Sequence, residues 1–170
     1  CIRDRLKDVQ EKRNILWLGE SNIEYKEITP FIDEIIENGY NLYFKGKPGN
    51  NNNLSDFLKN RNISIDNSSS FFECLTTNNI GLVVGTHSTA LMESWIVGVP
   101  SLALKSSYDY GSHLWEDELI EICEDKSSLN KTIIAYFGMN SKQLHIVRNK
   151  IWGNNVCFNK NKTVSILVQQ

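Results

Sequence analysis

The chain has 170 residues, which is enough for one domain with a hydrophobic core. Its formal net charge of −2 gives no electrostatic case for nucleic-acid binding, and no apolar run approaches the roughly 20 residues that span a bilayer. The charged residues that follow Cys1 are unlike a signal peptide. Because the sequence begins with Cys1 rather than methionine, we expect a fragment of a larger protein.

Short apolar runs alternate with amphipathic segments along the chain. We predict strands at residues 14–18, 40–44, 63–65, 80–84 and 101–105. We predict helices at residues 2–13, 25–38, 54–59, 68–77, 89–97, 114–123, 127–137 and 141–151. In the 25–38 pattern, Pro30 favours a helix that starts near Thr29, with Pro30 as its first residue.

This alternation predicts an α/β fold: a Rossmann-like, doubly wound parallel sheet with helices on both faces. We expect residues 1–170 to form a single domain, with 138–170 as a helical C-terminal extension. Cys74 and Cys123 fall in helical patterns without metal-ligand spacing, which favours buried thiols. The scattered cysteines fit a cytosolic protein, and we predict neither a metal nor a cofactor.

The segment 81–104 carries the most information about function. Its pattern predicts a buried strand, a tight polar turn, a helix and a second buried strand. Backbone N–H groups and the positive end of the helix dipole meet at such a turn, which favours an anion. In a doubly wound sheet, ligands also bind beyond the carboxyl ends of the strands. We therefore expect a phosphorylated ligand at Thr86, His87, Ser88 and Thr89.

Glu93 extends this expectation to a nucleotide. If Ser88 caps the helix and Thr89 is its first residue, Thr89 and Glu93 lie one turn apart on the same face. A capping box would need the acid at the position of Leu91, so capping does not explain Glu93. Its carboxylate is suited to accept hydrogen bonds from ribose hydroxyls. The alternative, a solvated helix glutamate beside an ordinary serine cap, stays open.

The segment 88–93, Ser-Thr-Ala-Leu-Met-Glu, followed by Gly98-Val99-Pro100, resembles a known nucleotide-sugar motif. The motif belongs to the C-terminal domain of GT-B glycosyltransferases and to the related UDP-GlcNAc 2-epimerases. The similarity is closest to bacterial surface-polysaccharide transferases of the capsule, teichoic-acid and sialic-acid types. It covers residues 14 to about 137 and is specific only in 81–104. It implies one half of a GT-B fold, in which the turn binds the diphosphate and the glutamate binds the ribose.

Three further side chains are candidates for the same site. Lys45 and Lys47 follow the second predicted strand, where transferases resembling this chain carry Lys-x-His-Pro, with a histidine that contacts the donor phosphate. Lys47 stands at the position of that histidine; it can neutralise phosphate, but acid catalysis by it is in doubt. His87 is suited to donate to a phosphate or to transfer a proton. Solvated lysines and a histidine bonded within its own turn are the alternatives.

The resemblance implies the donor-binding half of a metal-independent glycosyltransferase that transfers an activated sugar or polyol to a bacterial surface glycan. The acceptor glycan would bind an N-terminal domain absent from this chain, and no catalytic residue is assigned. We expect a cytoplasmic protein, with peripheral association at the inner face of the membrane left open. A nucleotide-sugar 2-epimerase and a non-catalytic nucleotide-binding module are the alternatives.

Overall fold

The computed structural model describes residues 13–20, 24–47, 55–107 and 120–155. Within them, six strands form one parallel sheet in the order β3-β2-β1-β4-β5-β6. The strands are β1 (Asn14–Leu18), β2 (Asn41–Lys45), β3 (Ser64–Ile65), β4 (Leu82–Gly85), β5 (Ser101–Leu104) and β6 (Ile122–Cys123). This is the strand order of the doubly wound dinucleotide-binding fold. The predicted Rossmann-like α/β architecture is therefore confirmed.

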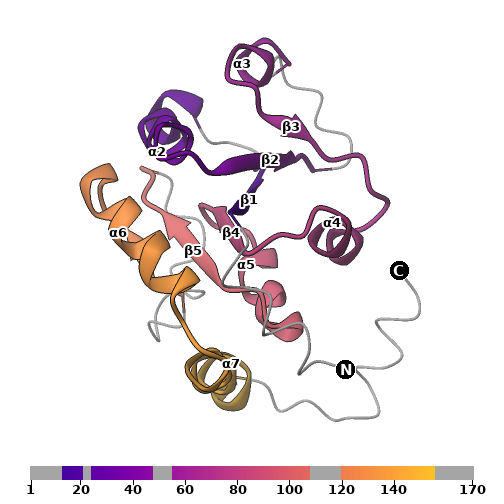
Figure 1. The fold of residues 1–170 in the computed structure, drawn as a ribbon, viewed down its shortest axis with the longest axis vertical. Coiled ribbons are helices and arrows are strands. Elements are labelled where there is room, and N and C mark those ends of the chain that lie inside the picture. Colours follow the sequence, from indigo (N-terminus) through magenta and orange to yellow (C-terminus); the bar gives the residue numbers. More distant parts are fainter. Residues whose placement is uncertain (1–12, 21–23, 48–54, 108–119, 156–170) are drawn as a thin grey trace.

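Helices cover both faces of the sheet (Figure 1). They are α2 (Tyr25–Glu37), α3 (Ser55–Asn60), α4 (Phe71–Thr77), α5 (Ala90–Glu93), the 3-10 helix η2 (Ser94–Val97), α6 (Lys126–Phe137) and α7 (Ser141–Asn155). In Figure 1, α2 and α6 lie side by side on one face, whereas α4 and α5 lie on the other. The helix predicted at 2–13 lies outside the described residues. Among the described residues, no helix has the length and apolarity needed to cross a bilayer.

The central strands β1 and β4 carry the middle of the core. Leu16 pairs with Tyr43 of β2 on one side and with Val83 of β4 on the other. Ile15, Leu16 and Val83 have no exposed surface. Strands covered by helices on both faces need apolar residues at consecutive positions, which explains the continuous apolar runs in the sequence. This rigid centre fixes where the loops at the carboxyl ends of β1 and β4 emerge.

The predicted start of the first helix is wrong. The helix α2 begins at Tyr25, and Pro30 lies inside it rather than at its first position. Pro30 is exposed, and the Thr29 hydroxyl donates to the Tyr25 carbonyl at 2.6 Å. The buried face of the helix includes Ile28 and Ile32, which are 2% and 0% exposed. Burying this apolar face outweighs the one backbone hydrogen bond that a proline inside a helix removes.

The helix predicted at 114–123 is wrong over its last residues. Ile122 and Cys123 form β6, which pairs with β5, while residues 114–119 lie outside the described part. Pairing at the edge of β5 decides the local structure, because a short apolar pattern does not distinguish helix from strand. The Asp125 carboxylate then accepts the backbone N–H groups of Ser127 and Ser128 at 2.9 and 3.2 Å, which starts α6.

The two described cysteines are buried thiols, as predicted. Burial raises the pKa of Cys74 to about 11 and also raises the pKa of Cys123. Such thiols are inert at neutral pH, since the thiolate is the reactive form. Cys74 lies in α4, but Cys123 lies in a strand rather than in the expected helix.

The helix predicted at 89–97 divides into two pieces, α5 and η2. The carbonyl oxygen of Leu91 accepts a hydrogen bond from the Ser94 hydroxyl at 2.9 Å and another from the Ser101 hydroxyl. Side-chain hydroxyls that donate to a helix carbonyl compete with its regular backbone bonding, and the chain continues here in the tighter 3-10 turns of η2. Gly98 ends η2 at φ 77°, a left-handed conformation that suits glycine.

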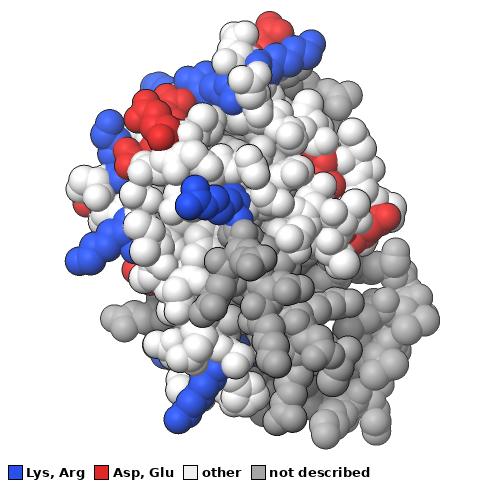
Figure 2. Space-filling view, in the orientation of Figure 1, with Lys and Arg blue, Asp and Glu red and all other residues white. Residues whose placement is uncertain are grey.

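Charged side chains of both signs are interspersed on the face shown in Figure 2. Lysine and arginine side chains lie beside acidic ones along its upper and left margins. A nucleic-acid interface needs basic residues gathered on one surface. The described residues on this face do not provide such a surface, which agrees with the low net charge of −2.

Candidate functional site

The fold places the candidate site where β1 and β4 end. These strands are neighbours in the sheet, but the chain continues from β1 toward β2 and from β4 toward β5, on opposite sides. Such a reversal opens a crevice outside the carboxyl ends of the strands, where doubly wound folds bind ligands. Residues 19–20 leave β1 there, and the predicted turn, residues 86–89, leaves β4.

Gly19 allows the chain to leave β1 in a narrow space. A Cβ atom at this position would lie 2.5 Å from the Phe44 ring. The backbone N–H of Gly19 also donates to the Lys45 carbonyl at 2.8 Å, which extends the pairing with β2 by one residue. A larger residue would displace the Phe44 ring, so the close approach favours glycine directly before Glu20.

Glu20 is the residue of this site that sequence analysis missed. Its carboxylate accepts the backbone N–H of Thr86 at 2.6 Å and that of His87 at 2.8 Å. The Thr86 hydroxyl donates to the same carboxylate. Glu20 and Thr86 are each only 5% exposed. An acid directly after the first strand was the available signal, because the exits of β1 and β4 meet in a doubly wound sheet.

This contact changes the expected arrangement of phosphate-binding groups. The backbone N–H and the hydroxyl of Thr86 both donate to Glu20, as does the backbone N–H of His87. A phosphate at these donors would have to replace the Glu20 carboxylate. Within the described part of the chain, the backbone N–H groups of Ser88 and Thr89 meet no acceptor. These two groups are therefore the better anchors for an anion.

The start of α5 lies close to its predicted position. The helix begins at Ala90, one residue later than expected, and the Ser88 hydroxyl oxygen accepts the Ala90 N–H at 3.3 Å. Thr89 and Glu93 lie one turn apart on one face, as predicted, and the Thr89 hydroxyl donates to Glu93 Oε1 at 3.4 Å. Thr89 is exposed and Glu93 is half-buried, so both side chains can meet a ligand.

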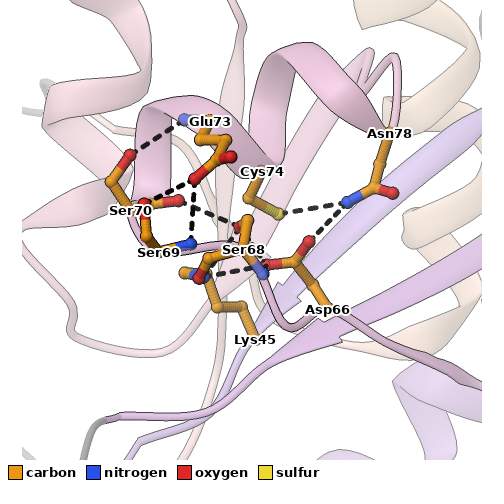
Figure 3. Close-up of polar contacts among 8 residues, drawn as sticks. All are labelled: Lys45, Asp66, Ser68, Ser69, Ser70, Glu73, Cys74 and Asn78. Atoms are coloured by element: carbon orange, nitrogen blue, oxygen red, sulfur yellow. Dashed lines mark hydrogen bonds and ion pairs between the residues drawn. The ribbon is translucent and has the colours of Figure 1, made fainter.

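The two lysines occupy different environments. Lys45 Nζ is bound by Asp66 Oδ2 at 2.8 Å and by the carbonyl and hydroxyl oxygens of Ser68 at 2.8 and 3.0 Å (Figure 3). An ammonium group has three N–H donors, so this set uses all of them. Lys47 is exposed. Among the described residues, no hydrogen bond or ion pair joins either lysine to the 86–89 turn.

A second acid from the same region binds the loop after β5. The Glu27 carboxylate of α2 accepts the backbone N–H and the hydroxyl of Ser107, at 2.9 and 2.6 Å. These hydrogen bonds from Ser107 lower the pKa of Glu27. Glu20 and Glu27 thus connect the exit of β1 to the exits of β4 and β5.

Position in the fold, rather than cavity size, identifies this site. A cavity of about 430 Å³ lies instead near the amino ends of β1 and β2, with Arg13, Tyr40 and Phe137 among its lining residues. Within the described residues, no group of three or more histidine, cysteine or acidic side chains is placed to hold a metal ion. The expectation of metal-independent binding stays a prediction.

Comparison with known proteins identifies the fold through solved structures. No protein-family model and no curated protein sequence matches the chain. MurG from Acinetobacter baumannii superposes with a TM-score of 0.59 at 14% identity, over 99% of this chain and 53% of that one. The wall teichoic acid polymerase TagF, a variant soaked with CDPG, superposes with a TM-score of 0.51 at 15% identity, over 88% and 40%.

The C-terminal CMP-Kdo binding domain of WaaA from Acinetobacter baumannii also superposes, with a TM-score of 0.51 at 10% identity. The match covers 88% of this chain and 96% of that domain. The chain thus spans about half the length of MurG and nearly all of the WaaA domain. Together with the six-stranded parallel sheet, these similarities confirm the predicted fold, a Rossmann-like half of the GT-B type.

Proposed function

We propose that this chain is the donor-binding part of a glycosyltransferase that transfers a nucleotide-activated sugar or polyol to a bacterial surface glycan. One observation carries the proposal: the 86–93 segment lies at the β1–β4 reversal of a sheet similar to a CMP-Kdo binding domain. Doubly wound folds bind nucleotides at this reversal. The proposed acceptor-binding part lies on a further domain, and the proposed location is the cytoplasm.

The residues at the turn divide the proposed task between them. The backbone N–H groups of Ser88 and Thr89, with their hydroxyls, bind phosphate oxygens, and His87 lies beside them. Glu93, one turn further on, binds the ribose hydroxyls. Hydrogen bonds to the phosphate stabilise the nucleotide leaving group as negative charge develops on it.

The lysines and Thr86 take revised roles in this proposal. Thr86 is buried beside Glu20 and shapes the turn rather than contacting the ligand. Lys45, whose donors are engaged by Asp66 and Ser68, stabilises the fold. Lys47 is exposed and contributes a long-range attraction for phosphate.

Calorimetric titration with CMP, CDP, UDP and GDP tests the proposal. The WaaA domain binds CMP-Kdo and the TagF structure was obtained with CDPG, so CMP and CDP are the first two probes. We expect at least one nucleotide to bind, and to bind equally well in EDTA. Silence from all four, with circular dichroism confirming a folded protein, would refute the proposal.

A second assay separates the donor-binding role from a complete enzyme. Incubated with a nucleotide sugar and an acceptor glycan, the chain alone should bind donor without transferring it. The reason is that, in this proposal, the acceptor glycan binds a further domain, so the acceptor hydroxyl is not held beside the donor. Rapid transfer by this chain would place the acceptor site within it and contradict the half-enzyme proposal.

A further inference from the structure

We propose that Glu20, acting through Thr86, holds the ring proton of His87 on Nδ1, so that Nε2 is the acceptor nitrogen of the neutral imidazole. Glu20 and Thr86 are then positioning residues for His87. Only the use of this nitrogen toward a ligand rests on the proposed function; the assignment of the proton rests on the hydrogen bonds alone.

The first step concerns the direction of the Glu20–Thr86 contact. Each oxygen of the Glu20 carboxylate receives a backbone N–H, Oε2 from Thr86 and Oε1 from His87. A carboxylate in this arrangement acts as an acceptor only. The Thr86 hydroxyl, which also contacts Oε2, must therefore donate its single proton to Glu20.

The second step follows from the use of that proton. Thr86 Oγ1 lies 2.9 Å from His87 Nδ1, a distance typical of a hydrogen bond. Because the hydroxyl proton already points to Glu20, the oxygen can only accept, and Nδ1 must carry the hydrogen. In a neutral imidazole only one nitrogen is protonated, so Nε2 has the lone pair.

Burial protects the hydrogen bonds that fix this tautomer from competing water. Glu20 and Thr86 are each 5% exposed, so water competes poorly for the hydroxyl between them. A carboxylate that orients an imidazole through its first nitrogen is the arrangement that prepares the second nitrogen to take a proton. Here one threonine hydroxyl stands between the acid and the ring. We infer that His87 is prepared as a proton acceptor beside the phosphate-binding turn.

Nitrogen NMR of the imidazoles tests the assignment directly. The chain contains three histidines, so long-range 1H–15N correlation spectra of the labelled protein can be assigned with the His87→Gln variant. At a pH where the ring is neutral, we expect a protonated Nδ1 and an unprotonated Nε2 for His87. A protonated Nε2 in the parent protein would overturn the proposal without any further variant.

Two substitutions at Thr86 separate the hydroxyl from the shape of the side chain. Thr86→Val removes the hydroxyl from a side chain of the same shape, and we expect the His87 ring to shift toward the Nε2-protonated form. Thr86→Ser keeps the hydroxyl and should retain the parent tautomer. His145, whose Nε2 lies 3.1 Å from Asn149 Nδ2 on α7, provides an internal control that should not change. An unchanged His87 tautomer in a folded Thr86→Val variant would also overturn the proposal.

Nucleotide titration of the same samples distinguishes this inference from the proposed function. Thr86→Val also removes the hydroxyl contact that joins the turn to Glu20. We therefore expect it to weaken binding of the nucleotide found by calorimetry about three- to tenfold, and Thr86→Ser to weaken it less. If no nucleotide binds while the tautomer is as expected, the proposed function fails and the inference stands. If a nucleotide binds while Nε2 carries the proton, the inference fails and the proposed function stands.

Discussion

Two buried carboxylates, Glu20 and Asp66, lie beyond the carboxyl ends of strands and bind different partners. Asp66 follows β3 and binds the ammonium group of Lys45 at 2.8 Å (Figure 3). Glu20 follows β1 and binds backbone N–H groups and a hydroxyl of the turn after β4. Among the described residues, no ion pair neutralises Glu20. Asp66 is thus part of an ion pair, whereas Glu20 shapes a turn through the hydrogen bonds that it accepts from Thr86 and His87.

The difference separates a structural cluster from a candidate site. Asp66, Lys45, Ser68 and Asn78 form a cluster of polar side chains, here called the Asp66 cluster. It connects β2 to the end of α4, because Asn78 Nδ2 donates to Asp66 Oδ1 at 2.7 Å. Burial opposes ionisation of Asp66, but hydrogen bonds from Lys45, Ser68 and Asn78 lower its pKa to about 2. The donors and acceptors of this cluster bond to one another, so they do not serve as ligand-binding groups. The Glu20 contact instead leaves the next two backbone N–H groups of the turn without an acceptor in the described chain.

Removing Asp66 should have the largest effect on stability. The side chains of Asp66 and Lys45 are 5% and 17% exposed, so Asp66→Ala leaves a poorly hydrated ammonium group. We expect a loss of about 3 kcal/mol in the free energy of unfolding. Asp33→Ala is the matched control, since the Asp33 and Arg61 side chains are 39% and 28% exposed, and should cost under about 1 kcal/mol. Equal losses of unfolding free energy for the two variants in urea denaturation would contradict the distinction between the buried and the more exposed ion pair.

Low pH should weaken the ion pair between Asp66 and Lys45. The folded pKa of Asp66, about 2, lies below its ordinary value of 3.8, so its stabilisation is complete above about pH 4. That stabilisation is lost as the pH falls toward 2, with an expected decrease of about 2 kcal/mol. The quantity to measure is the difference in unfolding free energy between the parent and Asp66→Asn across this range. A difference that does not narrow at low pH would contradict the pairing.

Glu93→Ala should affect binding without affecting stability. Among the described residues, the only hydrogen bond of its carboxylate is the long 3.4 Å contact from Thr89, so the free energy of unfolding should change little. Nucleotide affinity should fall by about 1–3 kcal/mol through loss of a charged hydrogen-bond partner. Glu37→Ala, at the exposed far end of α2, is the control. Equal affinity in the two variants would remove Glu93 from the site.

Lys47→Ala should give the smallest effect, and one that depends on salt. We expect nucleotide binding to weaken by under about 1 kcal/mol at low ionic strength, and by less at high ionic strength. The exposed Lys59 of α3 provides the control substitution. A loss that is independent of salt would indicate that Lys47 orders its loop rather than attracting phosphate.

The positions of β1 to β5 along the chain and the place of the turn could be predicted because they depend on local pattern. The apolar runs of β1 and β4 and the helical spacing of α2 and α6 appear directly in the sequence. The segment 114–123 could not be assigned in this way, since pairing with β5 decides the structure of Ile122 and Cys123. Pro30 was misleading because burial of the apolar face of α2 outweighs the cost of a proline inside the helix.

The partners of the site residues depend on contacts between distant parts of the chain. Glu20 and Thr86 are 66 residues apart, and no local pattern connects them. Lys45 was predicted as a phosphate ligand from its position after a strand, yet Asp66, 21 residues further on, binds its ammonium group. Thr89 and Glu93 could be paired correctly because helix geometry alone sets their spacing.

A 1H–15N correlation titration with CDP, and with CMP in parallel, tests the central claim most directly. If the donor nucleotide binds where β1 and β4 end, the largest amide shifts should fall on Ser88 and Thr89. The Asp66 cluster and the cavity near Tyr40 should stay unchanged. Shifts centred on either of those regions, or no shifts from a folded protein, would contradict the proposed site.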